Sequence, residues 1–266
     1  NCSNQIESEY HSLKNSNSIQ SNPPLQSLYI TQKPSILMPI KSKVFRTVLW
    51  DMDGTLIDSE PIWQEEELEL ARVNSIPWSE ADSQNCIGGP ISRVDSYMRE
   101  RAPGRFKEAE LSNKLIARIA DRLSEGVDFA PGAKVLIDEM ISLNLKLGLV
   151  TASARVIVDA ALPSIGHIFQ TVVSADDVAL PKPDPSGYIK AAADLRSPIE
   201  ECLIIEDSPN GMRAAIASGG WVLGLSHGKE LPRSPRARYV PSLDGVTFER
   251  ICNLFGESQD DSETKY

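Results

Sequence analysis

Short apolar segments alternate with longer amphipathic ones over most of this chain, and this alternation constrains its fold more than any other feature. Strands that alternate with helices form parallel sheets with right-handed crossovers. We therefore expect an α/β fold built on a parallel sheet. The predicted strands are FRTVLWD at 45–51, LKLGLVTAS at 145–153, TVVSAD at 171–176, CLIIEDS at 202–208 and WVLGLS at 221–226, and the predicted helices between them span 131–144, 154–165, 186–195 and 210–219.

One long helical block interrupts this alternation directly after the first strand. Residues 61–130 are mainly helical in pattern, with breaks at NSIPWSEAD, GGP and APG. Glu60 and Pro61 suit the first positions of a helix over 61–74. Its glutamates are expected to be mostly solvent-facing: Glu65, Glu66, Glu67 and Glu69. We interpret 44–60 with 131–250 as the core and 61–130 as an inserted helical domain.

The two ends of the chain differ in composition from this middle part. Residues 1–43 are rich in Ser, Asn, Gln and Pro, so we expect a disordered segment. Residues 256–266 have the composition of an acidic tail. Met38 lies just before the first strand, and one hypothesis places the natural start there. Detection of a peptide from residues 1–37 in native material would refute that hypothesis.

Composition restricts the functional class. The formal net charge of -10 argues against a general nucleic-acid binder, whose affinity depends on basic surface. No apolar run is long enough to span a membrane, and the N-terminus lacks a signal-peptide pattern. The four cysteines are widely spaced and form no CxxC pair, which favours reduced thiols and a cytoplasmic location. The oligomeric state is not indicated.

Polar side chains follow three of the predicted strands, and ligands of open α/β sheets bind beyond the carboxyl ends of strands. Each group has an ordinary structural explanation. An Asp-Gly turn explains Asp51 and Asp53. Helix N-caps explain the polar residues after the second and third of these strands, and a lone loop lysine such as Lys182 is ordinarily solvated. All of them converge on one sheet edge, which favours a site. The groups are Asp51 and Asp53, then Thr151, Ala152 and Ser153, then Glu206, Asp207 and Ser208, with Lys182 in the loop ALPKPDPSG.

The aspartate pair at 51 and 53 needs something to offset its electrostatic repulsion, such as a cation, a shared proton or water. An EF-hand calcium loop does not fit, because Thr55, Leu56 and Ile62 occupy positions that require Asp or Asn, Gly and Glu. Mg²⁺ with Asp51 and Asp207 as oxygen ligands does fit. Phosphoryl transfer uses these groups, because one carboxylate can attack phosphorus and a second can act as general acid and base. Lys182 can then neutralise developing charge.

The whole set resembles the haloacid dehalogenase-like superfamily over about residues 44–250, through DMDGTL, Thr151, the lysine of KPDP, and EDSPNG. The inserted helices resemble the cap of its β-phosphoglucomutase-like subgroup, and GTLIDSEP leading into them is typical of that subgroup's sugar-phosphate phosphatases. The resemblance implies a Rossmann-like core, an Asp51 nucleophile and an Asp53 acid/base. It implies phosphate binding by Thr151, Ala152, Ser153 and Gly54. It implies Mg²⁺ binding by Asp51, Asp207, the main-chain carbonyl of Asp53, and Glu206 as a ligand or close neighbour.

Three functions remain open. A Mg²⁺-dependent phosphatase of a small phosphorylated metabolite, of the sugar or polyol class, is favoured. A phosphosugar mutase uses the same core residues. A non-catalytic binding module is disfavoured because each core residue is present. The cap is expected to select the substrate, and Arg93, after the loop GGPIS, is the cap residue predicted to contact it.

Overall fold

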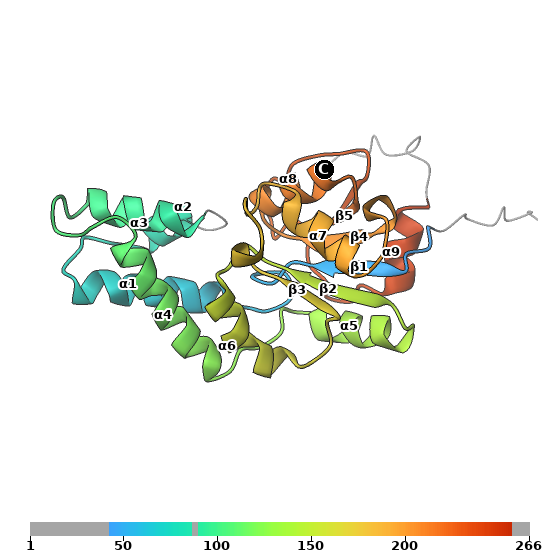
Figure 1. Cartoon of the computed structure of the whole chain (residues 1–266), viewed down its shortest axis with the longest axis horizontal. Helices are drawn as coiled ribbons and strands as arrows, with labels where there is room; N and C mark the ends of the chain where they lie inside the picture. Colours follow the sequence, from blue (N-terminus) through green and yellow to red (C-terminus); the bar gives the residue numbers. More distant parts are fainter. Residues whose placement is uncertain (1–42, 87–89, 257–266) are drawn as a thin grey trace, which may run out of the picture. The chain divides into compact units, whose positions relative to one another are not determined.

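Six parallel strands form one sheet, as the alternation of the sequence predicts. The structure is a computed structural model, and it describes residues 43–86 and 90–256. The strand order is β3-β2-β1-β4-β5-β6, which places the first strand at the centre (Figure 1). The strands are β1 Thr47–Trp50, β2 Lys146–Val150, β3 Thr171–Val173, β4 Leu203–Glu206, β5 Trp221–Leu225 and β6 Ala237–Val240.

Helices cover both faces of the sheet (Figure 1). Helices α5, α6 and α9 contribute to one buried cluster, and α7 and α8 contribute to the other. Within β1, Val48 and Trp50 belong to the first cluster and Leu49 to the second, because successive strand residues point to opposite faces. The bounds are α5 Ala133–Ser142, α6 Arg155–Ile165, α7 Ser186–Asp194, α8 Pro209–Ser218 and α9 Phe248–Leu254.

Four helices lie between β1 and α5, where the sequence predicts a helical block. They are α1 Glu60–Val73, α2 Glu80–Cys86, α3 Ile91–Glu100 and α4 Glu110–Ser124. Their ends agree with the predicted breaks at NSIPWSEAD and APG. The break at GGP falls partly on residues 87–89, which lie outside the described residues. The division into a core and an inserted domain stays a prediction.

Two of the four glutamates that the sequence predicts to be mostly solvent-facing in α1 do not face solvent. Glu66 and Glu67 are buried. The Glu66 carboxylate forms ion pairs with the guanidinium groups of Arg118 and Arg122 of α4, with N–O distances of 2.6 and 3.0 Å. Glu67 lines a cavity beside Ser83. A charged side chain on a helix becomes buried when a neighbouring element supplies a charge partner or encloses it. The sequence of α1 does not show which element will pack against it.

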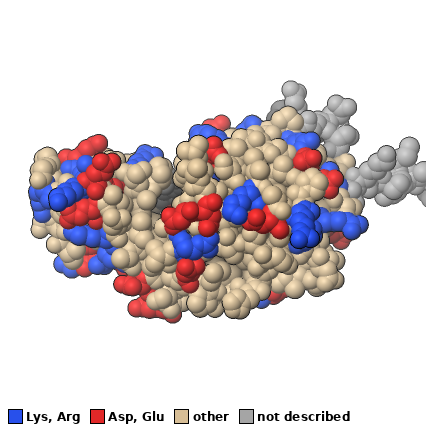
Figure 2. Space-filling view, viewed as in Figure 1, with Lys and Arg blue, Asp and Glu red and all other residues tan. Residues whose placement is uncertain are grey.

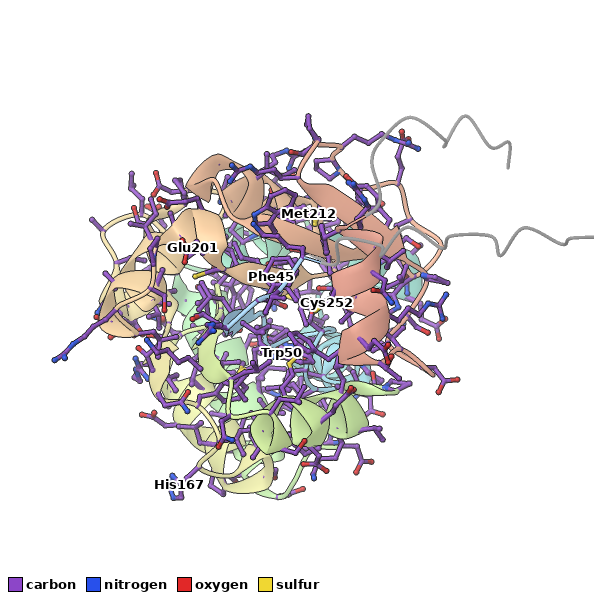
Figure 3. All side chains as sticks on the ribbon, turned by 90° about the vertical axis from the view of Figure 1, so that its right-hand side faces the viewer. Phe45, Trp50, His167, Glu201, Met212 and Cys252 are labelled. Atoms are coloured by element: carbon purple, nitrogen blue, oxygen red, sulfur yellow. The ribbon has the colours of Figure 1, made fainter. Side chains whose placement is uncertain are left out.

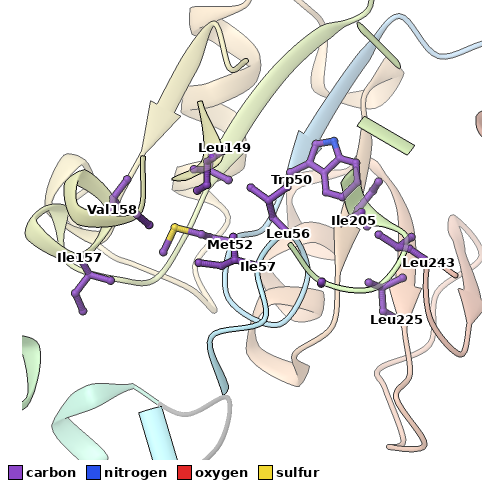
Figure 4. Packing of buried hydrophobic residues seen from close by; sticks show 14 of the residues in the cluster. Trp50, Met52, Leu56, Ile57, Leu149, Ile157, Val158, Ile205, Leu225 and Leu243 are labelled. Atoms are coloured by element: carbon purple, nitrogen blue, oxygen red, sulfur yellow. The ribbon is translucent and has the colours of Figure 1, made fainter. Parts of the chain in front are cut away.

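The loop after β1 is held by apolar packing. Met52, Leu56 and Ile57 are fully buried. They lie among the sheet and the residues of α6, including Leu149 and Ile157 (Figure 4). This packing fixes the backbone on both sides of Asp53.

The sheet interior and the molecular surface differ as expected for an α/β protein. Phe45 and Trp50 lie in the interior, whereas His167 projects at the periphery (Figure 3). Acidic and basic side chains are interspersed on the face shown in Figure 2.

The three cysteines in the described ranges are free thiols: Cys86, Cys202 and Cys252. None of the helices within 43–86 and 90–256 combines the length and apolar character needed to cross a bilayer. The predicted tails at 1–43 and 256–266 fall almost entirely outside those ranges.

Candidate active site

Three neighbouring strands bring the predicted site residues to one edge of the sheet. Strand β1 pairs with β2 on one side and with β4 on the other. Asp51 directly follows β1 and Thr151 directly follows β2, while Glu206 ends β4 and Asp207 follows it. Parallel strands end at the same edge, so these residues meet there although more than 150 positions separate Asp51 from Glu206.

Lys182 joins two of the three carboxylates. Its ammonium donates to Asp51 Oδ1 at 2.5 Å, to Glu206 Oε1 at 2.7 Å and to the carbonyl of Val150 at 2.8 Å. The three N–H groups of the ammonium thus each have an acceptor. Burial acts to lower the pKa of Lys182, but the charges of Asp51 and Glu206 outweigh it and raise the pKa above its usual range. The lysine is therefore a fixed positive charge beside Asp51.

The acidic cluster has the composition of a cation site. One carboxylate oxygen from each of Asp51, Glu206 and Asp207 lies within 4.8 Å of the others. Desolvation, followed by the charge of Glu206, raises the pKa of Asp51 well above its usual value. The same two causes raise the pKa of Asp207 to about 7. Lys182 contacts only two of these three carboxylates, and a set of carboxylate oxygens fits a divalent cation that prefers hard oxygen ligands.

Glu206 differs from the other two carboxylates of this cluster. It is fully buried and accepts hydrogen bonds from Lys182, from the Tyr188 hydroxyl, from the amides of Asp207 and Ser208, and from the Ser208 hydroxyl. Five donors therefore fix its carboxylate within the protein. Asp51 and Asp207 keep slight exposure, and they are the members of the cluster that reach solvent.

Asp53 has a separate environment from Asp51, although the two are neighbours in the motif. Its Oδ1 accepts from Ser59 Oγ at 2.7 Å and from Trp63 Nε1 at 3.3 Å. Its Oδ2 accepts from Ser153 Oγ at 2.7 Å and from Thr151 Oγ1 at 3.3 Å. The side chain of Asp53 is not a member of the acidic cluster. Metal binding through its main-chain carbonyl stays a prediction.

The predicted phosphate-binding residues surround this second carboxylate. Thr151 and Ser153 contact Asp53 directly, and the Ser153 amide donates to Thr151 Oγ1 at 3.0 Å. Ala152 is exposed and lines a neighbouring cavity. Gly54 lies against the Asp207 carboxylate. The structure therefore brings these residues together, while their phosphate-binding role stays a prediction.

Two glycines permit close approach at the site. Gly54 has a φ of +79°, and a Cβ there would lie 2.6 Å from Asp207 Oδ2. A Cβ on Gly211 would lie 1.6 Å from Glu206 Oε1. Gly211 belongs to the motif EDSPNG, yet the sequence analysis gave it no role. A side chain at either position would displace a carboxylate of the cluster.

Sequence analysis also missed Ser59 and Trp63, which contact Asp53 from the start of α1. Their only sequence signal is their position, six and ten residues after Asp53 at the start of a helix. A turn that includes Gly54, together with bridges from Ile57 to Asp53 and to Phe129, returns the chain to the site.

Arg93 lies on α3, and its side chain is exposed. Ile91 and Val94, its neighbours on that helix, line the cavity next to Asp53, whereas Arg93 is not among the lining residues. Two residues of the loop that precedes it, Gly88 and Gly89, lie outside the described residues. Substrate contact by Arg93 stays a prediction.

Known proteins resemble this chain in sequence or in structure. A family model described as haloacid dehalogenase-like hydrolase matches residues 48–224. Validoxylamine A 7'-phosphate phosphatase of Streptomyces hygroscopicus subsp. limoneus is 28% identical over 185 residues, covering 69% of this chain and 86% of that protein. Hexitol phosphatase B of Escherichia coli (strain K12) is 29% identical over 181 residues, covering 64% and 78%. The crystal structure of β-phosphoglucomutase from Clostridium difficile has a TM-score of 0.65 at 21% identity, covering 80% and 97%, which shows a shared fold.

Proposed function

We propose that this chain, which belongs to the haloacid dehalogenase-like hydrolase family, is a phosphatase that hydrolyses the phosphate monoester of a small sugar or polyol. One observation carries the proposal. Asp51 and Asp53 occupy different environments at one strand end, the first beside Lys182 and the second among hydroxyl groups. Two carboxylates with different partners can perform two different tasks.

Asp51 is the nucleophile of this proposal. Its free carboxylate oxygen attacks phosphorus, an acyl-phosphate bond forms, and the bond from phosphorus to the leaving-group oxygen breaks. Lys182, held 2.5 Å from the other oxygen, balances the negative charge that develops on the phosphoryl group. Water then attacks the phosphorus of the aspartyl-phosphate, which releases inorganic phosphate and regenerates the Asp51 carboxylate.

Asp53 is the proton carrier. In the first step it donates a proton to the leaving-group oxygen, and in the second it accepts a proton from the attacking water. The hydroxyls of Ser59 and Ser153 orient its carboxylate at 2.7 Å each. Thr151, Ala152, Ser153 and Gly54 would bind the phosphoryl oxygens.

The acidic cluster would hold Mg²⁺ through Asp51, Asp207 and the main-chain carbonyl of Asp53, with Glu206 orienting Lys182. When bound, Mg²⁺ supplies positive charge to the carboxylates and to the phosphoryl oxygens. The excess of carboxylates over ammonium groups in the cluster supports this assignment.

The helices of 61–130 would act as a cap that excludes water and selects the leaving group. Residues 44–60 and 131–250 would form the core. The chain reaches the cap immediately after Ser59, so a cap movement would also move Trp63 relative to Asp53. A phosphosugar mutase of the β-phosphoglucomutase type is the second candidate, because that enzyme shares the fold.

The test is ³¹P NMR of the purified protein with Mg²⁺, a panel of sugar and polyol phosphates, and a trace of glucose 1,6-bisphosphate. We expect inorganic phosphate to accumulate, and we expect the Asp51→Asn variant to lose turnover by at least about 10⁴-fold. Conversion of one sugar phosphate into its isomer without free phosphate would identify a mutase instead. Full activity of Asp51→Asn would exclude the nucleophile assignment.

A further inference from the structure

A cavity of about 320 Å³ lies beside Asp53, between α1, α2 and α3 and the loop after β2. Trp63 and Ser153, which both donate to Asp53, line it. In the proposed mechanism Asp53 protonates the leaving group, and a cavity lined by two of its hydrogen-bond donors is a place where that group can lie. Its volume suits a small metabolite.

The described residues that line this cavity include no Lys, Arg or His. Residues 87–89, which lie outside the described residues, are Ile, Gly and Gly and carry no cationic side chain. The ionisable lining groups with carboxyl side chains are Glu60, Glu67 and Asp176. A second phosphate or a carboxylate on the leaving group would therefore meet like charges among the described lining residues.

Cations occur near the cavity, including Arg93 beside the lining residues Ile91 and Val94, but none is among its described lining residues. Arg155 follows the lining residue Ala154, and its guanidinium pairs with Asp177 and donates to the carbonyl of Val172 at 3.2 Å.

His227 and Lys229 line a second hollow with Asp207, which shares Glu60 and Gln64 with the cavity beside Asp53. The charge of Lys229 lowers the pKa of Glu60, against a larger rise caused by burial. His227 and Lys229 are not among the residues that line the cavity beside Asp53.

Glu67 is the buried polar group that this cavity leaves unsatisfied. Glu67 is 5% exposed, and its Oε2 has no hydrogen-bond partner in the described part of the chain. Desolvation raises the pKa of Glu67 to about 7, against a lowering by its hydrogen bond with Ser83. Buried carboxyl oxygens without partners are rare, because an unpaired one loses the hydrogen bonds that it makes with water in the unfolded chain.

We infer that Glu67 hydrogen-bonds a hydroxyl group of the substrate, and that the cavity accepts an uncharged polyhydroxylated leaving group while rejecting one with a second phosphate or a carboxylate. The inference rests on the proposed function and narrows it. Gln64, which also lines the cavity, offers a neutral hydrogen-bonding group to a further hydroxyl. A mutase must bind a sugar bisphosphate, so this lining also favours the phosphatase.

The test compares kcat/KM for four substrates: sorbitol 6-phosphate, p-nitrophenyl phosphate, phosphoglycolate and glucose 1,6-bisphosphate. We expect sorbitol 6-phosphate to exceed the last two by at least about 10-fold. Glu67→Leu should lower kcat/KM for sorbitol 6-phosphate by about 10- to 100-fold while changing p-nitrophenyl phosphate, which has no hydroxyl, by less than about 2-fold. Glu67→Gln keeps a hydrogen-bonding group and should lose less.

Glu65→Leu is the matched control, because Glu65 is an exposed glutamate on the same helix, and both substrates should be hydrolysed as by the wild type. Equal losses for both substrates in Glu67→Leu, or a preference of the wild type for phosphoglycolate or the bisphosphate, would overturn the inference.

Calorimetric titration of the Asp51→Asn variant separates this inference from the proposed function. The variant should bind sorbitol 6-phosphate, and adding Glu67→Leu should raise Kd by about 10- to 100-fold. Binding of this kind without phosphate release by the wild type would refute the phosphatase but keep the cavity assignment. A Kd unchanged by Glu67→Leu would refute the role of Glu67.

Discussion

At the residue scale, neighbouring carboxylates acquire different properties from their partners. Asp51 lies beside Lys182 and Glu206, whereas Asp53 lies among Ser59, Trp63, Thr151 and Ser153. Both residues belong to one short motif, so their chemistry is decided by contacts and not by residue type. The same holds for Glu66 and Glu67, adjacent in α1, where one is paired with arginines and the other is unsatisfied.

Glu67 should make stability fall as pH rises. Its pKa is about 7 in the folded protein against 4.5 ordinarily, so the folded state binds more protons between these pH values. The free energy of unfolding should therefore decrease from about pH 4.5 to about pH 7. Glu67→Gln removes this contribution, so its stability relative to the wild type should rise across that window by up to about 3 kcal/mol.

Urea denaturation at pH 5, 6, 7 and 8 measures this difference, with the exposed Glu65→Gln as control. A stability difference between Glu67→Gln and wild type that is independent of pH would show that Glu67 does not titrate in this range.

At the scale of elements, the loop after β1 connects core packing to the site. Ile57 is fully buried and bridges Asp53 to Phe129, while the Gly54 amide donates to the Ile57 carbonyl at 3.0 Å. The backbone around Asp53 therefore depends on an apolar side chain that has no chemical role of its own.

Ile57→Ala should lower the free energy of unfolding by about 2–4 kcal/mol, because it leaves a cavity in a packed core. It should also lower kcat, since the loop that holds Asp53 would lose its anchor. Ile141→Ala is the control: Ile141 is 42% exposed on α5, and its loss should cost less than about 1 kcal/mol. Urea denaturation of both variants measures the difference, and equal stability losses would contradict this account.

At the scale of the whole molecule, the acidic cluster depends on two strands that the chain reaches far apart in sequence. Strands β1 and β4 are adjacent in the sheet, which brings Asp51 and Asp207 together with Glu206. A cation bound there would join segments from the beginning and the end of the fold.

Removal of divalent cations with EDTA should abolish activity, and excess Mg²⁺ should restore it. Asp207→Asn should raise the Mg²⁺ concentration needed for half-maximal activity by at least about 10-fold, because it removes one charged ligand. Asp58→Asn is the control, since Asp58 is an exposed acidic residue of the same region and should leave that concentration unchanged within about 2-fold. Full activity in EDTA would contradict a metal-dependent mechanism.

The sequence by itself determined the parallel α/β sheet, five of its six strands and the residues at the strand ends. Apolar periodicity and strand–helix alternation are local properties, so they can be read without the structure. Strand β6, Ala237–Val240, was missed because it is a short edge strand in which two of four residues are buried, and prolines and charges flank it. The short helix α9 after it was also missed.

Only the tertiary structure decided which groups meet. Lys182 reaches Asp51 and Glu206, Trp63 and Ser59 reach Asp53, and Glu67 turns into a cavity instead of solvent. These contacts join different elements, and their geometry follows from strand order and helix packing. A sequence pattern records which face of an element is apolar, but it does not record which neighbour will cover that face or leave a polar atom on it unpaired.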